Sequence, residues 1–292
     1  MLRSIFMLSA ATLAVAVLGQ PAAAQSYKFK TIDIPGEAQT ALFGDAGGTI
    51  LGWGISPSGT TNCTLITGKT YTVIADPNGV ATWCYNISSA GTVVGYYNTA
   101  DNAGYGFTYS NGTFTDFSLP GVGLGPIPLA ISTSGKYIAG YYYANNEAYG
   151  FVLKEGTKVT SFQIPGMAFV FPDGINGHGE MSVQTFDNSG NLHCFVGSAA
   201  NLTELNYPGT TYATNCEAIN NNGQVAGFYT DDSGTQYGIT YDPATQDFYT
   251  INVPGAADVN LLGITNSQTL LGFYQTTASG PWQGLKATGS FP

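Results

Sequence analysis

The stretch AINNNGQVAGFY, residues 218–229, decides the fold, because its pattern returns along the chain. NISSAGTVVGYY occupies residues 86–97, AISTSGKYIAGYY residues 130–142 and GITNSQTLLGFY residues 263–274. Each copy has a short apolar run, a polar turn, a second strand-like run with a glycine, and aromatic residues. Recurrence at a regular interval is the signature of a repeat protein.

Proline turns, most of them Pro-Gly, divide the chain into repeats. The prolines are 42, 43, 45, 43 and 46 residues apart and stand at Pro35, Pro77, Pro120, Pro165, Pro208 and Pro254. No linker separates the resulting units, of which there are six. The sequence therefore predicts six similar units of about 44 residues.

Within each unit, every segment has a physical reason. The first strand ends in a residue whose side chain can bond its own backbone and start a turn: Asp45, Ser88, Ser132, Asn176, Asn220 or Thr265. A glycine able to adopt positive φ follows in five units, and Gln268 takes that position in the sixth. The second strand then carries glycine and adjacent aromatic residues, as in Gly95-Tyr96-Tyr97. Adjacent side chains point to opposite faces of a strand, so this strand must be covered on both sides.

The number of strands and the two chain ends together indicate a closed ring. Third and fourth strands follow in each unit, and four strands in about 44 residues is the period of a propeller blade. Residues 27–35 have the pattern of a lone fourth strand, while residues 284–292 end after a third strand. An open solenoid would leave two incomplete ends. We predict an all-β fold, a six-bladed β-propeller of four-stranded blades over residues 25–292, closed by pairing of the N-terminal strand into the last blade.

The four cysteines fit this ring. Cys63 and Cys194 begin third strands, and Cys84 and Cys216 each lie seven residues before a turn glycine. Units one and four are opposite one another, so Cys63 and Cys194 cannot come within the Cα separation of about 7 Å that a disulfide requires. Symmetry leaves Cys63–Cys84 and Cys194–Cys216, each linking one blade to the next.

Composition and the N-terminus indicate export. Arg3, the apolar run 5–18 and the alanines at 22–24 form a secretory signal, which predicts a signal peptide over residues 1–24 with cleavage near Ala24. The run is shorter than the roughly 20 apolar residues that span a bilayer. Cleavage removes the single arginine and leaves seven lysines against 18 acidic residues, which disfavours nucleic acid as a partner. We expect a secreted or periplasmic monomer without membrane insertion or cofactor.

The repeat pattern resembles a known family. The motifs Ile-Asn or Ile-Ser, then Gly, Val-Val-Gly-Tyr and a Pro-Gly turn, together with His193-Cys194-Phe195, are similar to those of the bacterial extracellular repeat proteins of the HAF family, named for a His-Ala-Phe tripeptide. The resemblance covers essentially the whole mature chain. It implies a propeller-like repeat fold and export, and it implies no reaction and no catalytic residues.

Unit four departs from the pattern and supplies the first candidate site. Val183 replaces the strand glycine, Gln184 replaces the aromatic residue, and both histidines of the chain, His178 and His193, lie here. We expect His193 to lie opposite Gln184 in the hairpin.

An acidic pair is the second feature of interest. Asp173 lies on the first strand of unit four, and Glu217 takes the same place in unit five. First strands line the channel of a propeller, so the two carboxyls are expected near one channel mouth, where they could bind a cation or perform acid–base chemistry. The histidine spacing matches no zinc motif, and we predict no metal site.

Aromatic residues supply the third candidate. The repeated Tyr, Phe and Trp residues are expected to pack between blades, whereas Trp83 and Trp282 fall outside the repeated position and could form an exposed platform for a sugar.

Two functions stay open at this point. The first, which we favour, is a non-catalytic module that binds a glycan, a peptide or an envelope partner through loops at one face. The second is an enzyme of hydrolase or lyase type, or a cation-binding protein, with a polar site at the channel mouth. Propellers host both classes.

Overall fold

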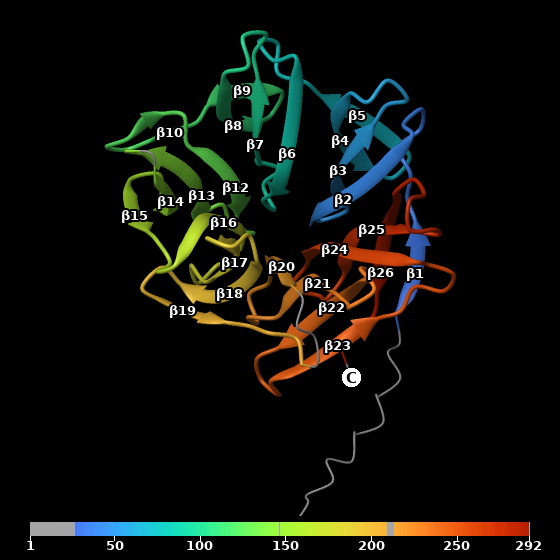
Figure 1. Ribbon diagram of the computed structural model, residues 1–292. Coiled ribbons are helices and arrows are strands. Elements are labelled where there is room, and N and C mark those ends of the chain that lie inside the picture. The colour runs from blue at the N-terminus through green and yellow to red at the C-terminus, as the bar shows by residue number, and fades with distance from the viewer. Residues whose placement is uncertain (1–26, 146, 209–212, 292) are drawn as a thin grey trace, which may run out of the picture.

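The computed structural model describes residues 27–145, 147–208 and 213–291. Six four-stranded antiparallel sheets stand around a central axis like the blades of a propeller (Figure 1). The predicted signal peptide, residues 1–24, lies outside the described residues. The number of blades and the number of strands in each blade are those predicted from the sequence.

Each blade takes its strands in chain order, except the last one. Blade one consists of β2 (Gln39–Ala46), β3 (Thr49–Ile55), β4 (Thr61–Thr67) and β5 (Thr70–Ile74). Blade two consists of β6 (Ala81–Ile87), β7 (Val93–Asn98), β8 (Gly104–Ser110) and β9 (Thr113–Asp116). Blade three consists of β12 (Ile127–Ile131), β13 (Tyr137–Ala144), β14 (Glu147–Lys154) and β15 (Lys158–Phe162). A small hairpin, β10 (Ser118–Leu119) with β11 (Gly123–Leu124), precedes blade three.

The other three blades repeat this order. Blade four consists of β16 (Met167–Ile175), β17 (Met181–Asp187), β18 (Leu192–Ser198) and β19 (Asn201–Glu204). Blade five consists of β20 (Thr214–Ile219), β21 (Val225–Thr230), β22 (Gln236–Asp242) and β23 (Asp247–Ile251). Blade six consists of β24 (Asp258–Ile264), β25 (Leu270–Gln275), β26 (Gln283–Thr288) and, as its outer strand, β1 (Lys28–Thr31).

The two ends of the chain meet in blade six. β1 pairs antiparallel with β26, from Lys28 opposite Thr288 to Thr31 opposite Leu285. In Figure 1 the blue β1 lies beside the red β26. The last blade thus gains its fourth strand from the start of the chain, the arrangement expected from residues 27–35 and 284–292.

The Pro-Gly segments that lie wholly within the described residues form tight turns between blades. At Pro120-Gly121, the amide of Val122 donates a hydrogen bond of 2.9 Å to the carbonyl of Leu119, and Gly121 has a φ of 84°. A bond from residue i+3 back to residue i with positive φ at i+2 defines a type II turn, for which proline followed by glycine is the preferred pair. The local sequence therefore fixes the point at which each unit ends.

Neighbouring blades touch closely where the third strand of one meets the first strand of the next. At Gly106 on β8, an added Cβ would lie 2.3 Å from the carbonyl oxygen of Pro126, just before β12. Cys63 and Cys194 hold the equivalent position on β4 and β18, and their side chains bond covalently across the same junction. Both predicted disulfides are confirmed: Cys63–Cys84 has a Cα separation of 5.8 Å, and Cys194–Cys216 one of 5.5 Å.

The hydrophobic core lies between blades as well as within them. One cluster combines Leu51 of blade one, Val93 and Phe107 of blade two and Phe273 of blade six. Hydrogen bonds also join the turns that follow the first strands β16, β20 and β24. The amide of Gly177 donates to Asn221 Oδ1 at 2.7 Å, and the amide of Asn221 donates to Asn266 Oδ1 at 2.9 Å. These bonds link blades four, five and six in sequence.

Among the described residues, no helix has the length and apolar character needed to cross a membrane.

Candidate functional site

The first strand of every blade lines the central axis (Figure 1). All six of these strands carry a register irregularity at the same place, and β16 has a second one between Met167 and Phe169. In β16, for example, Pro172 pairs with Val183 and Gly174 pairs with Ser182, so Asp173 stands in a β-bulge. A bulge re-aims a side chain at a fixed point of the strand. The six bulged residues all line one cavity on the axis: Phe43, Tyr85, Leu129, Asp173, Glu217 and Leu262.

This cavity, the axial cup, has a volume of about 340 Å³ and opens at the end of the ring where the first strands begin. Its wall includes Trp53, Tyr141 and Phe273, which follow the second-strand glycines, and Gln184, which takes that position in blade four. The lining is completed by Ala41, Phe171 and Trp282. The cup is therefore an aromatic bowl, with two carboxyl groups and one amide as polar side chains besides the tyrosine hydroxyls.

The aromatic rings hold one another in place. Trp53 lies with its ring centroid 4.6 Å from Phe43 and donates its indole N–H to the Cys84 carbonyl at 2.6 Å. Tyr141 meets Phe171 edge to face at 5.1 Å and 88°. Such contacts add to the stabilisation that burial provides and fix ring orientation, so this wall is preorganised.

The acidic pair predicted from the sequence forms part of the cup. Asp173 and Glu217 lie at equivalent positions on the adjacent strands β16 and β20, and both residues are half-buried in the lining of the cup. The side-chain amide of Asn215 donates a hydrogen bond of 2.6 Å to Glu217 Oε1. Asp173 Oδ2 is buried and has no hydrogen-bond partner.

This environment disfavours full ionisation of the pair. Burial, with the charge of Glu217 as a second cause, raises the pKa of Asp173 well above its ordinary value. Burial raises the pKa of Glu217 to about 7, although the hydrogen bond from Asn215 acts in the opposite direction. Two acids in one poorly hydrated site resist ionising together, so the pair keeps part of its protons at neutral pH.

Two tyrosines of the cup stay protonated. Burial raises the pKa of Tyr141 to about 12, with smaller effects from Tyr143, Tyr96 and Asp173. Burial also raises the pKa of Tyr85. Both phenol groups therefore remain neutral hydrogen-bond donors throughout the physiological range.

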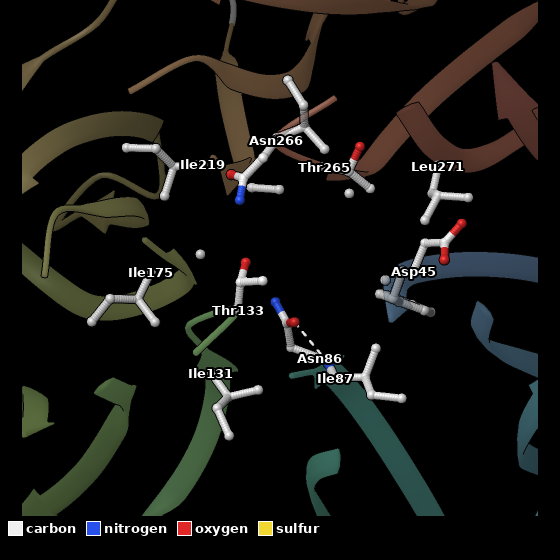
Figure 2. A pocket seen from close by; sticks show the side chains of 16 residues that line it. Asp45, Asn86, Ile87, Ile131, Thr133, Ile175, Ile219, Thr265, Asn266 and Leu271 are labelled. Carbon is white, nitrogen blue, oxygen red and sulfur yellow. Dashed lines mark hydrogen bonds between the residues drawn. The ribbon is translucent and has the colours of Figure 1, made fainter. Parts of the chain in front are cut away.

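A smaller cavity of about 90 Å³ occupies the other end of the axis. In Figure 2 the side chains of Asn86, Thr133 and Asn266 point into this cavity, whereas Ile87, Ile175 and Ile219 point away from it and pack in the core between blades. Phe43 lines both cavities and stands between them. This end of the channel is narrow and its exposed lining is mainly polar, in contrast to the aromatic cup.

One assignment from the repeat alignment is wrong. Asp45 was aligned with the polar turn residues such as Ser88, but Asp45 pairs with Ile50 as Ile87 pairs with Val93, so it takes the place of an isoleucine. Its carboxylate accepts a hydrogen bond from the amide of Gly48 at 2.7 Å and forms a 2.8 Å ion pair with Lys286.

The histidines do not join the acidic pair. His178 is exposed in the turn after β16, where its amide donates to Asn176 Oδ1 at 2.9 Å. His193 lies opposite Thr185, not opposite Gln184 as expected, and its Nδ1 is 2.7 Å from Glu204 Oε1. Neither histidine lines the cup. Within the described part of the chain, no group of three His, Cys, Asp or Glu residues is placed to hold a metal ion.

The two tryptophans singled out from the sequence have different places. Trp282 lines the cup and stacks on Phe273 with centroids 4.5 Å apart. Trp83 is half-buried, stacks on Tyr96 at 4.6 Å and 8°, and is not part of the cup wall.

Sequence reasoning missed most of the aromatic wall. Trp53, Tyr141 and Phe273 were assigned to packing between blades, and Tyr85 and Phe171 were not singled out. Part of the signal lies in the repeat: the bulged position lines the cup in all six blades, and the residue at the position after the second-strand glycine does so in four of them.

Comparison with known proteins supports the fold. No protein-family model matches the chain, and no curated protein matches it. Among solved structures, a six-bladed β-propeller lectin of Aleuria aurantia with a fucose recognition mode is 13% identical, with 87% of this chain and 95% of the lectin covered and a TM-score of 0.50. A protein of Agrobacterium tumefaciens assigned to TolB is 9% identical, with 86% and 90% covered and a TM-score of 0.57. TolB from Acinetobacter baumannii is 10% identical, with 86% and 64% covered and a TM-score of 0.52.

At these identities the likeness concerns the fold alone. The chain is a six-bladed β-propeller with four-stranded blades.

Proposed function

We propose that the protein is an exported, non-catalytic binding module of the HAF repeat type, and that it holds its ligand in the axial cup. The observation that carries the proposal is the cup itself: a cavity of about 340 Å³ with an aromatic wall and a few convergent polar groups. Ligand sites in proteins combine these features, with apolar surface for affinity and a few polar groups for orientation.

Export is supported by two features. The N-terminal sequence has the organisation of a secretory signal. The described structure contains two disulfides and no free cysteine, as is typical of proteins in oxidising compartments. We therefore place the mature protein in the periplasm or outside the cell, where glycans, peptides and envelope components are available as ligands. The solved lectin of the same fold binds a sugar, which is consistent with this class of ligand.

Tryptophan fluorescence provides the test. Trp53 and Trp282 line the cup, and Trp83 stacks on Tyr96 outside the cup wall. Oligosaccharides, peptides and small organic molecules would be titrated against the purified protein. A ligand of the cup should change the emission, and Trp282→Ala should weaken its binding at least tenfold. Tyr71→Ala, on the outer strand β5, should leave binding unchanged. If no compound changes the emission, or if both variants bind equally well, the cup is not the ligand site.

The acidic pair favours a second candidate function, an enzyme with acid–base chemistry. A carboxyl whose pKa is raised to about 7 can both donate and accept a proton near neutral pH. Under this alternative, a ligand found by titration would be converted by the protein and would survive incubation with Glu217→Gln. A ligand that stays intact with the unsubstituted protein supports the binding module.

A further inference from the structure

We propose that the axial cup selects a protonated amine, with the ammonium group beside Asp173 and Glu217 and its organic part against the aromatic wall. This inference rests on the proposed function, since it names the ligand class of the same site. Its supports are the charge of the lining, the identity of the wall residues and one unpaired oxygen atom.

The lining favours positive charge. Asp173 and Glu217 are its ionisable acids, and none of the lining residues is Lys, Arg or His. The chain carries a formal net charge of −10, so its overall field also favours cations over anions. An anionic ligand would meet two carboxyls and no counter-charge.

The aromatic wall favours an organic cation over a metal ion. The faces of Trp, Tyr and Phe rings carry partial negative charge and attract ammonium groups within about 6 Å of the ring centroid. The wall supplies Trp53, Tyr85, Tyr141, Phe171 and Phe273. A calcium ion needs six to eight oxygen ligands, which two carboxyls surrounded by rings do not supply.

The unpaired carboxylate oxygen favours a cation that carries N–H groups. Asp173 Oδ2 is buried without a hydrogen-bond partner, and a buried acceptor left unpaired costs about 1–3 kcal/mol. A protonated amine would donate to this atom, whereas a fully methylated ammonium ion could not. Glu217 already accepts a bond from Asn215 on Oε1 and would contribute mainly through its charge.

Binding of such a ligand should depend on pH in a defined direction. The titratable groups lining the cup are Asp173, Glu217, Tyr85 and Tyr141. The pKa values of both tyrosines are raised, so between pH 6 and pH 8 the carboxyls alone change charge. A cation binds better to the ionised pair, and its affinity should therefore rise over this range.

Matched pairs of small molecules test the inference by calorimetry and tryptophan emission. Cyclohexylamine would be compared with cyclohexanol, and benzylamine with benzyl alcohol, so that shape is nearly constant while the positive charge is present or absent. We expect the amine of each pair to bind at least tenfold more tightly at pH 8, and trimethylcyclohexylammonium to bind more weakly than cyclohexylamine.

Variants of the two carboxyl groups test whether they produce the preference for the amine. Asp173→Asn should remove the preference for the amine, and Glu217→Gln should reduce it and flatten its pH dependence. Asp232→Asn, an equal charge change at an exposed turn, should leave the preference intact. Melting curves of each variant establish that it is folded, and Glu217→Gln serves as the test if Asp173→Asn does not fold.

The outcomes separate the two proposals. Equal affinity for amine and neutral analogue, or a preference that survives Asp173→Asn, overturns the ammonium inference. If the neutral sugars or peptides bind in the cup while the amines do not, the inference fails and the binding module stands. If nothing in the whole panel binds, both fail.

Discussion

Replacement of Glu217 by glutamine should make the protein more stable at alkaline pH. The carboxyl of Glu217 has a pKa near 7 in the folded protein, against an ordinary value of 4.5, and burial is the main cause. An acid whose folded pKa is raised binds its proton more tightly in the folded state. The raised pKa of Glu217 therefore leaves the free energy of unfolding unchanged below about pH 4.5 and lowers it as the pH rises from there to about 7. This pH dependence is the reverse of that of a carboxylate whose pKa is lowered by folding.

The size of the effect follows from the pKa. A rise from 4.5 to about 7 corresponds to a loss of about 3 kcal/mol in the free energy of unfolding at pH 8. Glutamine has the shape of the neutral acid and can still accept the bond from Asn215, so it should avoid this loss. Each kcal/mol moves the melting temperature of a domain of this size by about 2 °C. Glu217→Gln should therefore melt roughly 6 °C above the unsubstituted protein at pH 8 and level with it at pH 4.5.

Thermal melts followed by circular dichroism from pH 4.5 to pH 8.5 provide the assay, with Asp232→Asn as the matched control. The quantity to compare is the difference between Glu217→Gln and the unsubstituted protein, because it cancels the contributions of the other acids. A difference that is constant with pH, or that grows toward low pH, would refute the buried state of the pair.

Two further predictions concern the ring. Replacing Cys194 and Cys216 together by alanine should reduce the free energy of unfolding by about 3 kcal/mol, because the disulfide closes a loop with a 22-residue separation and so limits the entropy of the unfolded chain. Urea denaturation would measure the loss, and a loss below about 1 kcal/mol would contradict this prediction. Gly95→Ala should lower the free energy of unfolding by about 3 kcal/mol or more, because its Cβ would lie 2.0 Å from the carbonyl oxygen of Trp83. Gly104→Ala, whose Cβ would have its nearest atom at 3.3 Å, should stay within about 0.5 kcal/mol of the unsubstituted protein. Equal melting temperatures of the two variants would show that the first strand can move away from Gly95.

The repeat predicts the fold well because each blade boundary depends on local chemistry. Proline and glycine fix the turns between blades. Gly106 and Cys63 take the same position in their blades, where the third strand comes close to the next blade. Glycine fits there because it has no side chain, and cysteine fits because its side chain bonds covalently to the next blade. These requirements act within a few residues and are therefore visible in the sequence.

Register within a hairpin was harder to predict. Nine residues separate Phe43 from Gly52, but ten separate Tyr85 from Gly95, because the first turn of blade one is shorter. An alignment anchored on the glycines therefore misplaces Asp45 by one residue, and a shift of one residue reverses the face of a strand. The same error of one residue set His193 opposite Gln184 instead of Thr185.

The cup could be predicted in part. Asp173 and Glu217 were identified because equivalent positions of neighbouring repeats meet at the axis. The aromatic wall was not, since the same residue types also pack between blades and the sequence does not tell which of the two faces a ring occupies. The bulge decides this, and it depends on pairing with the second strand.

Diffraction from crystals soaked in 4-bromobenzylamine would test the central claim most directly, since the amine is protonated at neutral pH and bromine scatters anomalously. The structure predicts a bromine peak inside the cup, against the wall that includes Tyr141 and Phe171, with the ammonium nitrogen within hydrogen-bond distance of Asp173 Oδ2. A bromine peak in the smaller cavity at the other end of the channel or on the outer surface, with the cup free of the amine, would contradict it.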